Sequence, residues 1–80
     1  MMQPLTLHIA PARILKIAEA ATERLRSSPY ASLKSVSCES DHDILYLRGR
    51  LSSFYHKQLA QETVAKVRGV TQVVNEIEVA

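Results

Sequence analysis

The chain has 80 residues, of which 46% are hydrophobic and 22% are charged, and its formal net charge is +2. This composition is ordinary for a soluble globular protein and excludes intrinsic disorder as the default. One domain of this size has a thin core, because it buries only about 60% of the surface that its unfolded chain exposes. The mild positive charge is well short of the concentrated field typical of nonspecific nucleic-acid binding.

Cys38 is the only cysteine, so the chain forms no intramolecular disulfide and no cysteine-rich metal site. A reducing compartment fits this composition best. The first ten residues lack the basic segment and unbroken apolar run of a secretory signal, and no later stretch approaches the roughly 20 apolar residues of a membrane span. We therefore expect a cytoplasmic protein from the sequence as it stands, or a periplasmic one if an export signal has been removed.

The N-terminal residues 1–11 have the pattern of a short strand that stops at Pro11. In this N-terminal arm, Leu5, Leu7 and Ile9 alternate with less hydrophobic residues. The folded domain is expected over residues 12–80. It opens with a helix from Ala12 to about Arg26, where apolar residues recur at helical spacing. The Ser-Ser-Pro segment that follows ends the helix, because the residue before a proline avoids helical angles.

The middle of the chain predicts a β-hairpin. Residues 34–39 form the first strand, with Val36 and Cys38 on one face. Residues 40–43 are a polar turn. Residues 44–51 form the second strand, whose inner face carries Leu45, Leu47 and Leu51. Two strands joined by so short a turn pair with each other.

A second helix and a last strand complete the chain. Ser52 or Ser53 caps the helix, which runs to about Val67. Gly69 supplies the positive φ that ends it, and hydrophobic residues then alternate with polar ones to residue 79. The expected fold is a two-layer α+β arrangement in the order α-β-β-α-β, with two helices packed on one face of a small mixed three-stranded sheet.

A set of aliphatic, small and glycine residues recurs at a recognisable spacing. They are Gly49, Ala60, Gly69, Val70, Val73, Asn75, Ile77 and Val79. The pattern resembles that of the BON domain, a small module of bacterial osmotic-shock periplasmic and membrane-associated proteins. The resemblance implies the same fold and a role in attachment to membranes or assemblies, with phospholipid binding as the family's proposed activity.

No residue pattern indicates catalysis or metal binding, so we expect no enzyme, no metal and no cofactor. His8, His42 and His56 share no repeated spacing, whereas zinc sites need three or four convergent ligands. The acidic residues beside His42 fit a solvated turn better than a metal loop. Cys38 is in phase with the core face, where cysteine behaves as a small hydrophobe. Ser53 beside His56 fits a helix cap better than a nucleophile and its base.

Basic residues give a better indication of function. Arg13, Lys16 and Arg24 lie beside the apolar face of the first helix and are our candidate lipid-binding residues. Each contributes about 1 kcal/mol near an anionic membrane surface. Glu19 and Glu23 lie close by, so an ordinary solvated helix face remains the alternative.

The sheet face away from the helices predicts self-association. Ile44, Tyr46 and Val74 are expected there with apolar side chains exposed, and contiguous exposed apolar surface marks interaction sites. Together with Leu5, Leu7 and Ile9 of the N-terminal arm, they predict a homodimer in which the arm adds to a sheet edge. On the same face, Arg48 and Arg50 are expected opposite Glu76 and Glu78.

The sequence therefore favours a noncatalytic interaction module of BON type, which docks to an anionic phospholipid surface or to a partner protein. One alternative is a small RNA- or DNA-binding module, although only Tyr46 is placed to stack on a base. The other is a homo-oligomerisation domain without a ligand.

Overall fold

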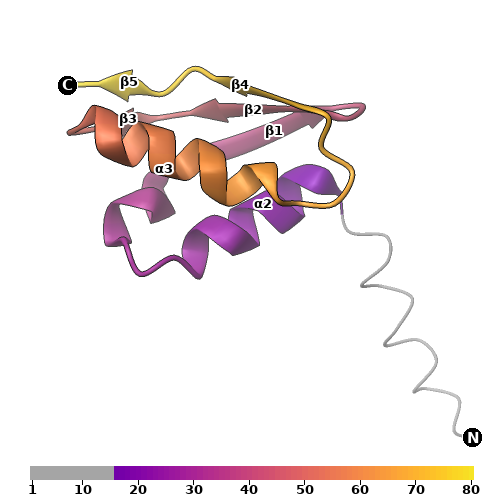
Figure 1. Cartoon of the computed structure of the whole chain (residues 1–80), viewed down its shortest axis with the longest axis horizontal. Coiled ribbons are helices and arrows are strands. Elements are labelled where there is room, and N and C mark those ends of the chain that lie inside the picture. The colour runs from indigo at the N-terminus through magenta and orange to yellow at the C-terminus, as the bar shows by residue number, and fades with distance from the viewer. Residues whose placement is uncertain (1–15) are drawn as a thin grey trace, which may run out of the picture.

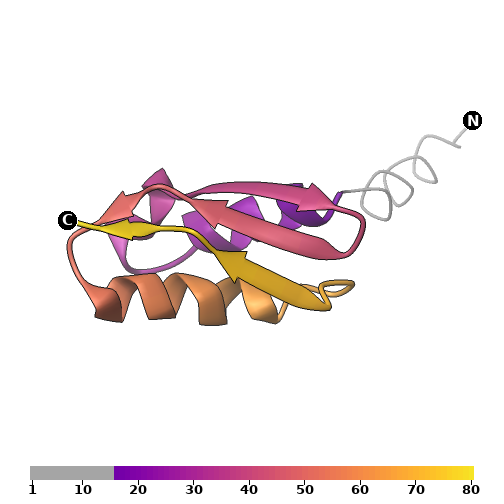
Figure 2. The same cartoon turned by 90° about the horizontal axis from the view of Figure 1, so that it is seen from above.

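The computed structural model describes residues 16–80, which form two layers. The elements are α2 (Ile17–Arg26), the 3-10 helix η1 (Ala31–Ser35), β1 (Ser37–Asp41), β2 (Ile44–Arg48), β3 (Arg50–Leu51), α3 (Phe54–Ala65), β4 (Gln72–Asn75) and β5 (Glu78–Val79). Both α-helices lie on the same side of the strands (Figures 1 and 2). The predicted two-layer α+β fold is confirmed.

The sheet has the strand order β1-β2-β4, and it is mixed as predicted. β1 pairs with β2 in antiparallel fashion, and β2 pairs with β4 in parallel. A second parallel pair, β3 with β5, continues this ladder beyond Gly49. Backbone hydrogen bonds from Glu76 N to Leu47 O and from Glu78 N to Gly49 O, each 2.9 Å, join the two pairs. The second hairpin strand and the last strand, each predicted as continuous, are therefore both interrupted, the former at Gly49 and the latter at residues 76–77. The two strands remain paired on either side of the interruption.

The hairpin turn is tighter than predicted. Asp41 pairs with Ile44, so β1 runs two residues beyond the expected strand end at residue 39 and only two residues form the loop. His42 adopts φ 60°, the left-handed conformation that two-residue hairpin loops require. The polar side chains of residues 40 and 41 indicated a turn, but backbone pairing extends through them.

The segment before β1 is a 3-10 helix rather than the start of a strand. Residues 34 and 35, predicted as extended, lie in η1, and β1 begins only at Ser37. Leu33 is fully buried and its N–H donates to Tyr30 O, while Val36 N–H donates to Leu33 O. The burial of Leu33 and Val36, three residues apart, selects the three-residue turn over an alternating strand.

Helix α2 begins later than predicted. Lys16 is extended, with φ −71° and ψ 156°, and its N–H donates to the Glu19 carboxylate at 3.3 Å. A continuous helix from residue 12 is therefore wrong, because a local carboxylate satisfies the first N–H and Lys16 serves as the N-cap. The N-terminal arm, with Leu5, Leu7 and Ile9, lies outside the described residues, as do His8 and Arg13.

Helix α3 has the predicted start and a slightly earlier end. Ser53 is the N-cap, and its hydroxyl accepts a hydrogen bond from His56 N at 3.1 Å. The helix ends at Ala65, two residues before the predicted end, and Gly69 takes the expected positive φ, at 98°. A Cβ on Gly69 would lie 3.3 Å from Ile17 Cδ1, so a side chain there would also crowd α2.

The core between the two layers is aliphatic throughout. The hairpin contributes Leu45 and Leu47, which are fully buried as predicted. Among residues 16–80, every buried side chain is hydrophobic: Ala21, Leu25, Leu33, Val36, Leu45, Leu47, Leu51, Ala60, Val64, Val67 and Ile77. Cys38 and Val73 pack against this core, as their strand phase predicted.

Candidate functional site

The predicted lipid-binding stripe falls on the exposed side of α2, as far as the structure describes it. Lys16 and Arg24 are exposed, and Arg13 lies outside the described residues. Glu19 and Glu23 are exposed on the same helix, so this surface carries both signs of charge. The role of the stripe stays a prediction.

The histidines within residues 16–80 have local partners. His42 Nδ1 lies 2.8 Å from the Asp41 carboxylate in the hairpin turn. His56 Nδ1 lies 3.5 Å from Ser32 Oγ, away from the Ser53 hydroxyl that caps the helix. Ser53 therefore acts on the backbone of His56 and not on its ring. Within this part of the chain, no group of three or more His, Cys, Asp or Glu side chains converges as a metal site requires.

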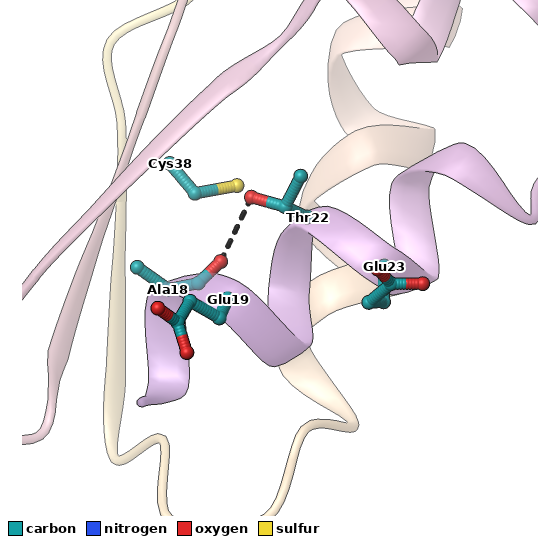
Figure 3. Close-up of a pocket in the computed structure, with 5 residues that line it drawn as sticks. All are labelled: Ala18, Glu19, Thr22, Glu23 and Cys38. Atoms are coloured by element: carbon teal, nitrogen blue, oxygen red, sulfur yellow. Dashed lines mark hydrogen bonds between the residues drawn. The ribbon is translucent and has the colours of Figure 1, made fainter. Parts of the chain in front are cut away.

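A shallow groove of about 240 Å³ lies between α2 and β1 (Figure 3). Thr22 and Cys38 face each other across it, and Thr22 Oγ1 donates to Ala18 O at 2.8 Å. Burial raises the pKa of the Cys38 thiol, and a hydrogen bond with Thr22 lowers it by less. The thiol is therefore protonated near neutral pH, which is the opposite of what a reactive cysteine needs.

The sheet face away from the helices is better covered than predicted. Ile44, Tyr46 and Val74 are half-buried rather than exposed. The Arg48 guanidinium lies 5.7 Å from the centre of the Tyr46 ring, so part of the covering comes from within the face itself. Tyr46 pairs with Val74 across β2 and β4, and Ile44 lies two residues before Tyr46 on β2, as the alternation predicted. Their role in self-association stays a prediction.

Ion pairs cross this face where they were expected. Arg48 Nε donates to Glu76 at 2.8 Å, and Arg50 donates to Glu78 at 3.1 Å. Arg48 also pairs with Glu39 on β1. Glu39 and Glu76 raise the pKa of Arg48 through their hydrogen bonds. All five side chains in these pairs are about half exposed or more, so the pairs contribute little to stability.

Three exposed aromatic side chains on neighbouring segments were missed by the sequence interpretation. Phe54 is 75% exposed, Tyr55 is 61% exposed and Tyr30 is 38% exposed. Tyr30 and Tyr55 meet edge to face, with ring centroids 6.3 Å apart and hydroxyls 3.4 Å apart. This hydrogen bond raises the pKa of Tyr55. We call Tyr30, Phe54 and Tyr55 the aromatic end.

The aromatic end lies where the loop after α2, η1 and the first turn of α3 come together (Figures 1 and 2). One signal in the sequence pointed to it. Phe54 and Tyr55 directly follow the helix cap and fall outside the apolar face of α3, which Ala60 and Val64 define. The partner Tyr30 is 25 residues away along the chain, so its arrival depends on the fold.

Comparison with known proteins identifies the family. The model of the BON domain matches residues 15–80, which is most of the chain. No curated protein matches the sequence. BON domains are generally noncatalytic modules that bind phospholipid or protein. Among residues 16–80, neither helix has the length and apolar character needed to cross a bilayer. The resemblance seen in the sequence is confirmed, and the chain belongs to the BON domain family.

Proposed function

We propose that this chain is a noncatalytic docking module, which attaches to an anionic phospholipid surface or to a partner protein. The observation that carries the proposal is the BON family match over residues 15–80. We further propose a cytoplasmic location, because of the single cysteine; the docking chemistry is the same if the module works in a periplasm.

In the lipid version, the basic residues of α2 supply the attraction. Lys16 and Arg24 are exposed, and Arg13 precedes them in the sequence. Each basic side chain near an anionic surface contributes about 1 kcal/mol. Glu19 and Glu23 reduce the field, so the binding is expected to be modest and sensitive to salt.

Vesicle cosedimentation at low salt tests this version. Full-length protein is expected to sediment with phosphatidylglycerol-containing vesicles and not with pure phosphatidylcholine. The double variant Lys16→Gln/Arg24→Gln is expected to bind about thirtyfold more weakly, since it removes about 2 kcal/mol of attraction. Lys66→Gln, at the exposed C-cap of α3, is the matched control. If neither vesicle binds the wild-type protein, only the protein-docking version remains.

A second proposal is self-association, which the open sheet edges favour. Within residues 16–80, β1 and β4 each pair with β2 alone, so each has an outer edge without a strand partner. A groove of about 480 Å³ runs along β1 beside Tyr46 and Arg48. We propose that Leu5, Leu7 and Ile9 add to such an edge in a homodimer.

Analytical ultracentrifugation of the full-length protein and of a variant lacking residues 1–10 tests the second proposal. The full-length protein is expected to sediment as a dimer and the shortened one as a monomer. If both proteins sediment as monomers, the homodimer proposal is wrong. If both sediment as dimers, the N-terminal arm is not part of the dimer interface.

A further inference from the structure

The aromatic end holds most of the aromatic surface of the molecule. The chain has one Phe, three Tyr and no Trp, and three of these four side chains are the exposed Tyr30, Phe54 and Tyr55. Phe54 is the most exposed of them, at 75%. Aromatic rings with a phenolic tip suit the boundary between water and hydrocarbon, where one end of the ring is wet and the other is apolar.

The segments that carry the aromatic end are rich in basic residues, and Glu62, one residue beyond them on α3, is the acidic side chain that acts on Tyr55. Residues 24–38 and 48–61 contain Arg24, Arg26, Lys34, Arg48, Arg50 and Lys57, and no acidic residue. Arg48 and Arg50 form the ion pairs on the sheet face. Within residues 16–80, the other four form no ion pair. The aromatic side chains are therefore carried by segments with a surplus of uncompensated positive charge.

The ring geometry favours insertion over base stacking. Tyr30, Tyr55 and His56 pack against one another at steep angles, between 49° and 75°. Nucleic-acid stacking platforms instead present ring faces to successive bases. The four basic residues without an ion pair in these segments complement an anionic surface. Among anionic surfaces, the interface of a bilayer also suits the tyrosine rings, because Tyr is enriched at the headgroup level of membranes.

We propose that the aromatic end is the part of this module that enters the interface of an anionic bilayer, with Phe54 inserted deepest. The basic residues of the same segments then face the lipid headgroups. This inference rests on the lipid version of the proposed function. It adds an apolar contact with the bilayer to the charge attraction that the basic residues of α2 provide.

A single tryptophan placed at residue 54 tests the proposal directly, because the chain has no Trp of its own. With full-length Phe54→Trp, phosphatidylglycerol-containing vesicles are expected to shift the emission to the blue, and lipids brominated on their acyl chains are expected to quench it. Gln72→Trp is the matched control. Gln72 is exposed on β4, beside the hairpin turn, because Thr71 N donates to Asp43 O at 3.0 Å.

A second variant measures the energetic contribution. Phe54→Ser is expected to weaken vesicle binding about tenfold, and the loss is expected to persist at high salt, where charge attraction is screened. Because Phe54 is largely exposed, the thermal unfolding of this variant is expected to stay that of the wild type.

The outcomes separate this inference from the proposed function. Vesicle binding by Phe54→Trp with an unchanged tryptophan emission would overturn the inference and leave the charge-driven docking intact. No vesicle binding by the wild type would overturn the lipid version together with the inference. If single-stranded nucleic acid, but not vesicles, quenches Phe54→Trp, the aromatic end is a stacking surface and the proposal is wrong.

Discussion

At the scale of single residues, Asn75 ties the last strand to α3. Its amide Nδ2 donates to Lys57 O at 3.0 Å and to Gln61 Oε1 at 3.2 Å, and its Oδ1 accepts from Ile77 N at 3.2 Å. These bonds lie at the interruption between β4 and β5. A family position that looked like one of packing is therefore a polar crosslink between the two layers.

Asn75→Ala is expected to destabilise the fold by about 1–3 kcal/mol, because the partly buried Ile77 N–H loses its acceptor and the two bonds from Asn75 to α3 are lost. Asn75→Asp keeps the acceptor for Ile77 but loses both donors, so it is expected to recover only part of the loss. Urea unfolding measures both variants. Gln72→Ala, on the same strand but exposed, is the control and is expected to change stability by less than about 0.5 kcal/mol.

Cys38 gives a prediction about pH. Its pKa is raised in the folded state, so the folded protein holds the thiol proton more tightly than the unfolded chain does. The thiol's contribution is therefore complete below the unfolded pKa of about 8.5, and it is lost as the pH rises from there through the raised pKa of the folded state.

The stability difference between wild type and Cys38→Ala is expected to shrink between neutral and alkaline pH in urea unfolding. Iodoacetamide is also expected to react more slowly with the native protein than with the unfolded one. A native thiol that reacts as fast as the unfolded one would show that burial does not protect it.

At the scale of elements, the predictions are confirmed where a hydrophobic period extends over many residues. They are wrong where local hydrogen bonds set the ends of an element. Helix α3 and the hairpin follow from apolar spacing over many residues. The 3-10 helix η1 was missed because Leu33 and Val36 are too few to define a period. The late start of α2 depends on one carboxylate, Glu19, that reaches its own N-cap.

The N-cap of α3 gives a prediction at the scale of elements. The sequence left Ser52 and Ser53 as alternative caps, and the structure assigns the role to Ser53. Ser53→Ala is expected to destabilise the protein by about 1 kcal/mol, because the His56 N–H loses its acceptor. Ser52→Ala is the matched control and is expected to be nearly neutral. Equal losses in thermal unfolding would mean that the hydroxyls exchange roles.

At the scale of the whole molecule, charge is distributed unevenly along the sequence. Asp41 ends β1 and Asp43 lies in the hairpin loop, while residues 24–38 and 48–61 contain basic residues and no acidic one. The charges could be read from the sequence, and so could the ion pairs across the sheet face. The aromatic end could not, because Tyr30 meets Tyr55 only after the two layers pack.

The central strand β2 also sets an order of folding. Its partner β1 is joined to it by a two-residue loop, whereas β4 reaches it only after the whole of α3. Hairpins form in about 1–10 μs, and closing the longer crossover delays the parallel ladder. Asn75→Ala is therefore expected to accelerate unfolding in stopped-flow experiments and to leave the folding rate nearly unchanged. We therefore expect the hairpin to form the folding nucleus and the last strand, held by its asparagine, to set the lifetime of the native state.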